Sequence, residues 1–291
     1  MWAIILHGGA KTIRPGEELA NRQGCLAALK CGAEVLRAGG SSIDAVEAAV
    51  LALENDPTFN AGYGSALNSD DEVETCAAVM EGGEWNVGAI AAAKGIRNPV
   101  RAARAMLFEE PILIAAGGAR KFAEENGVEL CSQNALAASG EEAESEERSH
   151  DTVGCIALDG AGQLATAVST GGLEGSPAGR IGDSPQPGCG FYCDNEVGGV
   201  VFSGDGEEIA RAMLAARVIH ALDGTSPDGA VQAAIRVVEK IGGEAGAIAL
   251  TPDGRFGWEH NSSHFAVAYE HSSMPHPLVH LCKQEEDEGH G

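Results

Sequence analysis

The residues best suited to chemistry lie near the middle of the chain, where Asp151 is followed by Thr152 and a run of apolar residues. A threonine hydroxyl is a weak nucleophile until a base removes its proton. If the chain were cut between these two residues, Thr152 would begin a new chain. Its own α-amine, with a reference pKa of about 7.7–8.0, would then serve as the base near pH 7. The alternative is an ordinary polar start to a buried strand, and an Asp-Thr pair alone does not separate the two interpretations.

A polar segment precedes this pair. Residues 141–148 contain five glutamates and one arginine. Such a run has too little apolar surface to offset its ordering entropy, so we predict a flexible acidic linker at about 132–149. Cleavage after Asp151 would leave this linker as a tail that can move away from the new N-terminus. We therefore expect one domain, 1–291, divided into an α subunit (1–151) and a β subunit (152–291).

Apolar periodicity predicts the elements that must position these residues. Strands are expected at 2–6, 74–80, 87–93, 112–116, 153–158, 164–169, 197–202, 247–250, 256–259 and 265–269. Helices are expected at 17–38, at 42–53 with Ser42 as N-cap, after Asn98-Pro99, at 207–222 and at 227–241. This order favours an α+β fold, with helices outside two layers of mainly antiparallel sheet. The polar C-terminal stretch that holds His276, His280 and Cys282 is expected to be a mobile tail, and not a metal site.

The overall charge excludes several classes of partner. The formal net charge is −24, and both halves of the chain share the acidic excess. Nucleic acids and anionic membrane surfaces require a basic face, so we expect neither as a partner. No apolar run is long enough for a signal sequence or a membrane span. None of the eight cysteines forms a C-x-x-C pair, so neither a zinc ribbon nor a thioredoxin-type motif is indicated. Most lie in apolar surroundings, where a free cysteine behaves as a small hydrophobe, so we expect reduced thiols and a cytoplasmic protein.

Short motifs run in order along nearly the whole chain. They are 7–10 (His-Gly-Gly-Ala), 44–47 (Asp-Ala-Val-Glu), 56–65 (Asp-Pro-Thr-Phe-Asn-Ala-Gly-Tyr-Gly-Ser), 79–82 (Val-Met-Glu-Gly), 98–100 (Asn-Pro-Val), 150–154 (His-Asp-Thr-Val-Gly), 169–172 (Ser-Thr-Gly-Gly), 179–185 (Gly-Arg-Ile-Gly-Asp-Ser-Pro) and 203–207 (Ser-Gly-Asp-Gly-Glu). Each is weak alone. As a set they resemble the plant-type asparaginase and isoaspartyl peptidase family of N-terminal-nucleophile hydrolases, which also contains glycosylasparaginase. The resemblance implies a four-layer αββα sandwich that cleaves itself between Asp151 and Thr152.

The same resemblance implies roles for individual residues. Thr152 would be the nucleophile, and Thr170 would hydrogen-bond and orient it. From the residues alone, Thr170 could equally cap the turn at Gly171-Gly172. Arg180 and Asp183 would hold the α-carboxylate and the α-amine of an aspartyl group, which suits a guanidinium fork and a carboxylate. The alternative for this pair is a surface ion pair in a loop.

Further roles concern the oxyanion and the surrounding loops. The Ser203 hydroxyl and the Gly204 N–H fall where the family has its oxyanion hole, with serine in place of the usual threonine. One such donor typically lowers a barrier by about 3–4 kcal/mol. Gly206 matches a glycine whose carbonyl helps bind the substrate amine. Asn60 matches a loop asparagine near the nucleophile, or else forms an Asx-turn. No cofactor is implied, but the family's counterpart of loop 55–68 can hold sodium through backbone carbonyls.

One departure from the family pattern concerns Cys76, which stands where the family usually has an aspartate. Any hydrogen bonds of that carboxylate are lost or changed. The activity implied by the resemblance is hydrolysis of β-aspartyl dipeptides and L-asparagine, with release of L-aspartate, by an assembly of two α and two β chains. A glycosylasparaginase-type amidase is the alternative enzyme. An uncleaved, inactive relative that acts as a binding protein is the alternative from another class.

Overall fold

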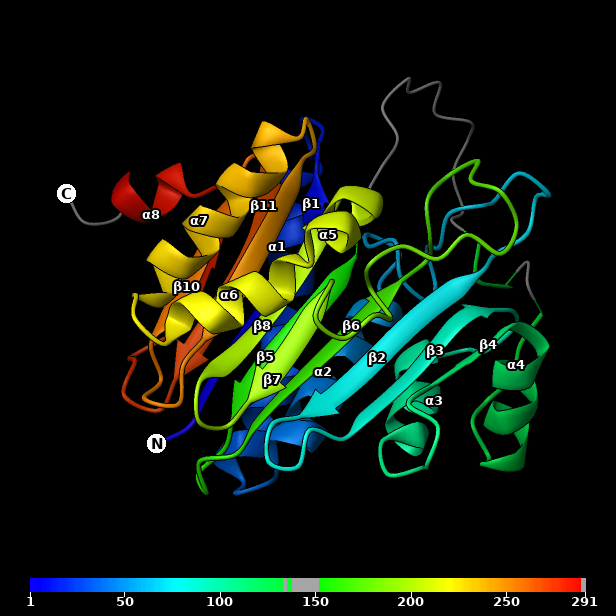
Figure 1. Cartoon of the computed structure of the whole chain (residues 1–291), viewed down its shortest axis with the longest axis horizontal. Helices are drawn as coiled ribbons and strands as arrows, with labels where there is room; N and C mark the ends of the chain where they lie inside the picture. Colours follow the sequence, from blue (N-terminus) through cyan, green and yellow to red (C-terminus); the bar gives the residue numbers. More distant parts are fainter. Residues whose placement is uncertain (133–134, 138–151, 289–291) are drawn as a thin grey trace.

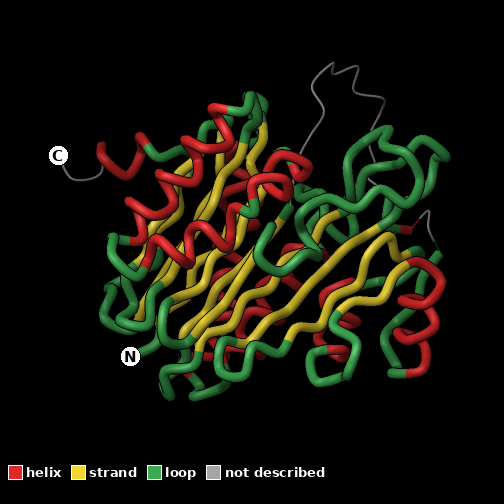
Figure 2. Tube along the Cα trace, viewed as in Figure 1, coloured by secondary structure: helices red, strands yellow, loops and turns green. Residues whose placement is uncertain are grey.

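The structure is a computed structural model that describes residues 1–132, 135–137 and 152–288. Two sheets pack face to face, and helices cover the outer face of each (Figures 1 and 2). The predicted four-layer αββα sandwich is thereby confirmed. Most of the linker expected at about 132–149 lies outside the described residues, and so does Asp151.

The larger sheet has eight strands in the order β12-β11-β1-β5-β6-β2-β3-β4. Its strands are β1 (Ala3–Lys11), β2 (Thr75–Glu81), β3 (Val87–Ala93), β4 (Leu113–Ala115), β5 (Val153–Leu158), β6 (Leu164–Thr170), β11 (His264–His271) and β12 (Leu278–His280). All neighbours are antiparallel except β3 and β4. Strand β5 is internal, between β1 and β6, so Thr152 stands at the start of a fully paired strand.

The smaller sheet has the order β10-β9-β8-β7. Its strands are β7 (Phe191–Asp194), β8 (Gly198–Gly204), β9 (Ala245–Leu250) and β10 (Phe256–His260). The two sheets contact each other through β1, β5 and β6 on one side and β7, β8 and β9 on the other. This contact brings the end of β8, with Ser203 and Gly204, to the start of β5.

Helices form the two outer layers. Those on the larger sheet are α1 (Glu18–Arg37), α2 (Ser42–Glu54), α3 (Pro99–Met106) and α4 (Ala116–Glu125). Those on the smaller sheet are α5 (Gly206–Ala212), α6 (Leu214–Leu222) and α7 (Pro227–Lys240), and a short helix α8 (Gln284–Glu288) lies near the C-terminus. Among the described residues, no helix combines the length and the apolar character needed to cross a membrane.

Alternation along β5 decides which way the candidate nucleophile faces. Val153, Cys155 and Ala157 pack into the core under the helices, whereas Ile156 and Leu158 pack between the two sheets. Because successive strand side chains point to opposite faces, Thr152 belongs to the inter-sheet side. The sandwich therefore places its hydroxyl towards the smaller sheet.

The N-terminal half differs from the sequence-based prediction in three places. Strand β1 does not end at Leu6 but continues to Lys11, and its register with β11 shifts between His7 and Ala10. The N-cap of α2 is Ser41, whose hydroxyl accepts from Asp44 N at 3.1 Å, so the assignment of Ser42 was wrong by one residue. Helix α4 was not predicted, because two adjacent glycines near its start resemble a loop.

The C-terminal half also differs in three places. Strand β7, which directly follows the glycine- and proline-rich loop 171–190, was missed. The single helix expected at 207–222 is two helices, which meet at Met213 in a left-handed conformation with φ of 49°. The expected mobile tail is wrong as well, since β12 pairs with β11 and Leu281 is buried.

Candidate active site

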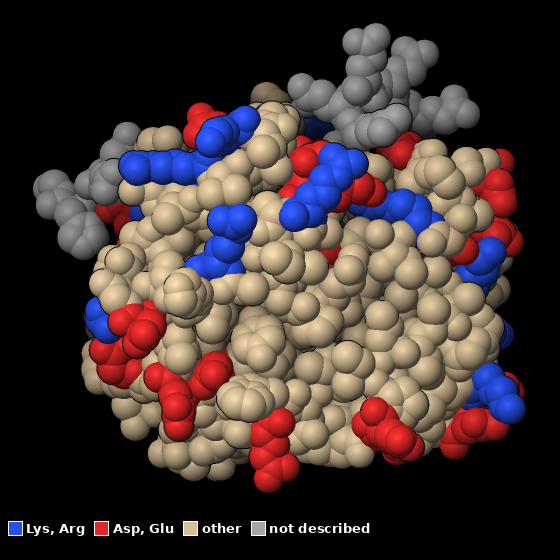
Figure 3. Space-filling view, viewed as in Figure 1, with Lys and Arg blue, Asp and Glu red and all other residues tan. Residues whose placement is uncertain are grey.

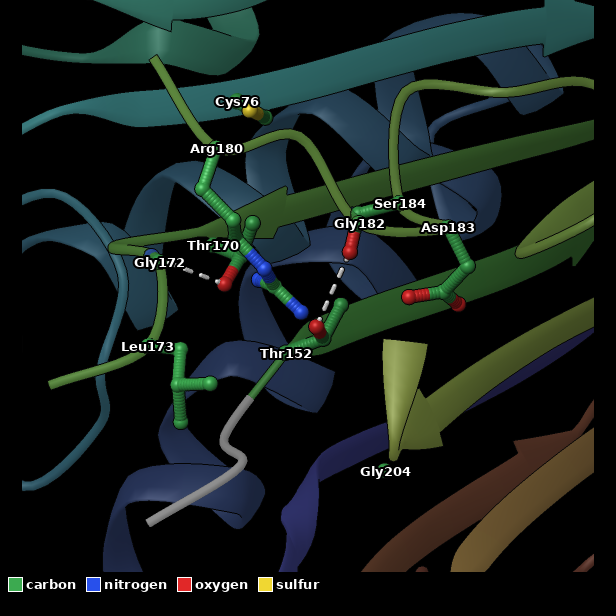
Figure 4. A pocket seen from close by; sticks show the side chains of 10 residues that line it. All are labelled: Cys76, Thr152, Thr170, Gly172, Leu173, Arg180, Gly182, Asp183, Ser184 and Gly204. Atoms are coloured by element: carbon green, nitrogen blue, oxygen red, sulfur yellow. Dashed lines mark hydrogen bonds between the residues drawn. The ribbon is translucent and has the colours of Figure 1, made fainter. Parts of the chain in front are cut away.

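A pocket holds Thr152 where one end of each of β2, β5, β6 and β8 meets the loop 171–190 (Figure 4). Its lining residues are Cys76, Thr152, Thr170, Gly172, Leu173, Arg180, Gly182, Asp183, Ser184 and Gly204. Five of the residues predicted for the site are in this set. Of the other four, Asn60, Ser203 and Gly206 lie next to residues of this set, and Asp151 lies outside the described residues.

Thr152 is held at both its backbone and its side chain. Its backbone N donates to Ser203 Oγ at 3.2 Å, and its hydroxyl shares a 3.0 Å hydrogen bond with Ser184 Oγ. Its side chain is buried except for a small part. A threonine fixed in this way presents its oxygen to the pocket in one orientation.

Ser203 joins three strands at the site. Its hydroxyl oxygen accepts from Ala10 N at 2.9 Å as well as from Thr152 N. Ala10 N reaches this oxygen because the irregularity after His7 re-aims the end of β1. The irregularity at Gly8-Gly9 thus lets the end of β1 contact β8.

Thr170 lies at the end of β6 and lines the pocket, but its hydroxyl has a different partner from the one expected. Its Oγ1 accepts from Gly172 N at 3.2 Å, while the hydroxyl of Thr152 pairs with Ser184 (Figure 4). In this form of the chain Thr170 therefore caps the turn, which was the alternative interpretation. Thr170 still lies opposite Thr152 and lines the same pocket.

Arg180 and Asp183 come from the loop 171–190 and face the same space as Thr152 (Figure 4). The guanidinium binds Glu207 through two bonds, Nε–Oε1 at 2.8 Å and Nη2–Oε2 at 2.6 Å. Burial raises the pKa of the Asp183 carboxyl to about 7, with the Asp183 N–H and the Arg180 charge acting against it. Its Oδ2 accepts no hydrogen bond from the described residues. That oxygen is also closed off from solvent, and a Cβ on Gly190 would lie 2.7 Å from it.

Two positions next to this pair require glycine, one for the path of the backbone and one for the approach of α5. Gly204 has a φ of 140°, and a Cβ there would lie 2.3 Å from Glu244 O. At Gly206 a Cβ would lie 2.8 Å from Asp183 Oδ1 and 3.1 Å from Arg180 Nη2. Only glycine lets the start of α5 approach the carboxyl and the guanidinium this closely.

Asn60 supports the pocket from behind, and does not line it. Its Nδ2 donates to Gly172 O at 2.8 Å, its Oδ1 accepts from Ala66 N at 2.9 Å, and its carbonyl accepts from Gly171 N at 2.8 Å. The side chain thus ties loop 55–68 to the turn after β6. This contact fits neither a simple Asx-turn nor a direct contact with the nucleophile.

Cys76 occupies the first half of β2, paired with Thr170 on β6, and lines the pocket. Its Sγ accepts from Ala92 N at 3.4 Å. Burial raises the pKa of this thiol to about 11, so it is neutral near pH 7. An uncharged thiol therefore lines this pocket at the position where the family usually has a carboxylate.

Metal binding was expected only in loop 55–68. Within residues 1–132, 135–137 and 152–288, no three His, Cys, Asp or Glu side chains gather as metal ligands would. In the loop, however, the carbonyl oxygens of Pro57 and Phe59 lie 3.0 Å and 2.6 Å from where a Cβ on Gly64 would stand. Phe59 O already accepts from Ala61 N at 2.9 Å, so these two carbonyls do not by themselves define a cation site. A bound ion there would supply only rigidity to the loop that Asn60 links to the pocket.

Two residues at the site were not given roles by sequence reasoning. Ser184 and Glu207 lie inside the quoted motifs at 179–185 and 203–207 but were not singled out. The sequence places a hydroxyl directly after Asp183 and a carboxylate directly after Gly206, and these neighbours could have indicated both residues. Their importance depends on how the loop and α5 approach β5, which no local pattern records.

The class of protein follows from the fold and this pocket together. An αββα sandwich that places a threonine at the start of an internal strand, facing the second sheet, is the arrangement of an N-terminal-nucleophile hydrolase. The guanidinium and carboxyl beside it suit a small zwitterionic substrate.

The chain belongs to the asparaginase family. The family described as "Asparaginase" matches residues 1–142 and 131–278. The chain is 38% identical over 268 residues to the isoaspartyl peptidase/L-asparaginase of Rattus norvegicus, a match that covers 86% of this chain and 80% of that protein. It is 37% identical over 289 residues to the protein of the same name from Bos taurus, with 94% and 91% covered. For the Homo sapiens protein the identity is 35% over 284 residues, with 91% and 92% covered.

Proposed function

We propose that this chain cuts itself between Asp151 and Thr152 and then hydrolyses β-aspartyl dipeptides and L-asparagine, releasing L-aspartate. The observation that carries the proposal is the position of Thr152 at the start of an internal strand, in one pocket with Arg180 and Asp183. The relatives from rat, cattle and human are named for these two activities. The pocket would thus combine a nucleophile, Thr152, with two groups that bind the charged ends of an amino acid, Arg180 and Asp183.

The aspartyl group of the substrate would bind through its two charged ends. Its α-carboxylate meets the Arg180 guanidinium, which Glu207 already holds in a fixed orientation. Its α-ammonium meets the Asp183 carboxyl, which lines the pocket and would bind a cation in its ionised form. The β-carbonyl then lies towards Thr152. This arrangement explains why a free α-amine and α-carboxylate would both be needed in the substrate.

The reaction would proceed in two steps. The α-amine freed by cleavage takes the proton of the Thr152 hydroxyl, and Oγ1 attacks the β-carbonyl carbon. Ser203 Oγ–H and Gly204 N–H stabilise the oxyanion. The carbon–nitrogen bond breaks, the leaving amine takes the proton, and an ester remains on Thr152. Water then hydrolyses this ester and releases aspartate. The same hydroxyl, acting on the carbonyl of residue 151, would open the chain.

Cleavage would divide the protein into α (1–151) and β (152–291) chains, and we include an assembly of two of each in the proposal. Figure 3 supports self-association: although the net charge is −24, the middle of the face shown, over β7 and β2, carries few charged side chains. All eight cysteines are free thiols, which suits a reducing compartment such as the cytoplasm. The mass of the purified protein by light scattering tests the assembly.

The test of cleavage and activity is a denaturing gel combined with an assay for released aspartate. The wild-type protein should give two bands of nearly equal size and hydrolyse a β-aspartyl dipeptide. Thr152→Ala should give one full-length band and no hydrolysis, whereas Thr12→Ala, on the exposed surface, should behave as wild type. Wild-type protein that stays whole and inactive would contradict the proposal and favour the binding-protein alternative. Faster turnover of a glycosylated asparagine than of the dipeptide would favour a glycosylasparaginase.

A further inference from the structure

Ser184 makes a side-chain contact with the candidate nucleophile. The two hydroxyl oxygens, Ser184 Oγ and Thr152 Oγ1, lie 3.0 Å apart, and both residues are buried, at 3% and 6% exposure (Figure 4). This is a normal length for a hydrogen bond between hydroxyls, each of which has one hydrogen to donate. Any change at Ser184 therefore acts directly on the reacting oxygen.

Three hydroxyls around Thr152 have separate partners. Ser203 Oγ accepts from the backbone N of Thr152, and Thr170 Oγ1 accepts from Gly172 N. The hydroxyl oxygen of Thr152 is left to Ser184. The three groups thus divide the work: one fixes the backbone of the nucleophile, one fixes the adjoining turn, and one fixes the reacting atom.

The turn that carries Ser184 is rigid. Gln186 clamps it at both sides, since its N donates to Asp183 O at 2.9 Å and its Nε2 donates to Gly182 O at 2.7 Å. Pro185 restricts the backbone immediately after the serine. Ser184 also follows Asp183 directly in the chain, so the group that would bind the substrate ammonium and the group that holds the nucleophile move as one unit.

We infer that Ser184 is a further catalytic residue, which donates its hydroxyl hydrogen to Thr152 Oγ1 and so turns the hydrogen of Thr152 towards its own α-amine. The inference rests on the proposed function. When Oγ1 attacks, its proton passes to the α-amine, the oxygen–carbon bond forms, and the carbonyl oxygen becomes the oxyanion. Ser184 keeps its own proton throughout. Its donated hydrogen bond stabilises the partial negative charge on Oγ1 before the new bond is complete.

Ser184→Ala should therefore slow the chemistry more than it weakens binding. We expect kcat for a β-aspartyl dipeptide to fall about 10- to 100-fold, the range for loss of a hydrogen bond to a charged group, with KM within about threefold of wild type. Turnover is expressed per cleaved chain, counted from the gel. Self-cleavage, which uses the same oxygen, should slow as well.

A pH profile separates this role from a merely structural one. The bond from the Thr152 hydroxyl to its α-amine favours the neutral amine and lowers its pKa. Without Ser184 the hydroxyl is free to turn away, so the acid limb of the kcat/KM profile should move to higher pH in Ser184→Ala. Ser184→Thr keeps a hydroxyl at this position and should restore both the rate and the acid limb. A change that only loosened the fold would leave the limb where it was.

Ser262→Ala is the matched control, because it also removes a largely buried serine hydroxyl, one that donates to His264 O at 2.9 Å between β10 and β11. It should keep wild-type kcat and pH profile. Wild-type kcat per cleaved chain in Ser184→Ala would overturn the inference, and so would equal losses in Ser184→Ala and Ser184→Thr. An inactive wild-type protein would instead refute the proposed function, so the two failures are distinct.

Discussion

Two buried carboxyl groups lie on opposite sides of strand β6 and differ in what surrounds them. Glu54, at the end of α2, accepts from Ser169 Oγ at 2.7 Å and from Val100 N at 2.8 Å on the helix side. Asp183 lines the pocket on the other side, with Thr170. Burial raises the pKa of both carboxyls to about 7, and each has one oxygen without a partner among the described residues.

The difference shows that a raised pKa alone does not identify a functional group. Burial is the first cause of both shifts, and it acts on any carboxyl taken from water. What sets Asp183 apart is its position in a pocket beside Arg180 and Thr152, where a ligand can reach it. Glu54 instead joins the helix layer to the sheet. We therefore expect Asp183 to control binding and Glu54 to control stability.

The largest effect is expected when Asp183 is changed. Asp183→Asn removes the charge that would hold the substrate ammonium, and loss of a close, desolvated charge pair costs about 2–5 kcal/mol. We predict a fall in kcat/KM of at least about 30-fold, carried mostly by KM. Steady-state kinetics on a β-aspartyl dipeptide measure this. Glu54→Gln is the matched control and should leave KM unchanged; a similar rise in KM in both variants would refute the distinction.

The next prediction uses pH to separate the same two groups. Asp183 must be ionised to bind an ammonium, and its pKa is raised to about 7. The inhibition constant of L-aspartate, the product, should therefore rise as pH falls below 7, approaching about tenfold per pH unit. In Asp183→Asn this dependence should be lost. In Glu54→Gln it should persist, and its disappearance there would mean that Glu54 is the group that governs binding.

Glu54 should make the free energy of unfolding depend on pH. Its unfolded pKa is near 4.5 and its folded pKa is raised to about 7, so between these values the unfolded state holds fewer protons than the folded state. The free energy of unfolding must then fall as pH rises through this window. Between pH 5 and pH 8 the wild type should lose about 1–3 kcal/mol more than Glu54→Gln, as measured by urea unfolding. Equal pH dependence in the two proteins would contradict the raised pKa.

Much of the fold was predictable because the strands are continuous apolar runs. The predicted ranges 87–93 and 153–158 match β3 and β5 to the residue, since both faces of these strands are buried. Short or glycine-containing elements were not predictable. Strand β7 forms because β8 pairs with it, and α4 forms despite Gly117 and Gly118 because Ala119 and Ala123 pack into the core. In both cases tertiary contacts outweigh local preference.

The same limit applies to the site. The motif resemblance gave the residues that gather in the pocket, and Thr152, Arg180 and Asp183 lie there as expected. It did not give the pairings. That Ser184, and not Thr170, bonds the Thr152 hydroxyl depends on how closely the loop 171–190 approaches β5. How closely the loop approaches the strand is determined by the packing of the two sheets, and no local sequence pattern predicts it.

The smallest predicted effect concerns Ser169, which donates to Glu54 Oε1 while its neighbour Thr170 lines the pocket. Ser169→Ala removes one buried hydrogen bond, so stability should fall by about 1 kcal/mol at pH 5, where the carboxyl is protonated. At pH 8 the loss should be larger, because the lost bond was made to a charged oxygen and its removal raises the pKa of Glu54 further. Urea unfolding at both pH values measures this, and KM should stay at the wild-type value. If Ser169→Ala raised KM as Asp183→Asn does, the helix side of β6 would also govern binding, and the proposed division between the two carboxyls would be wrong.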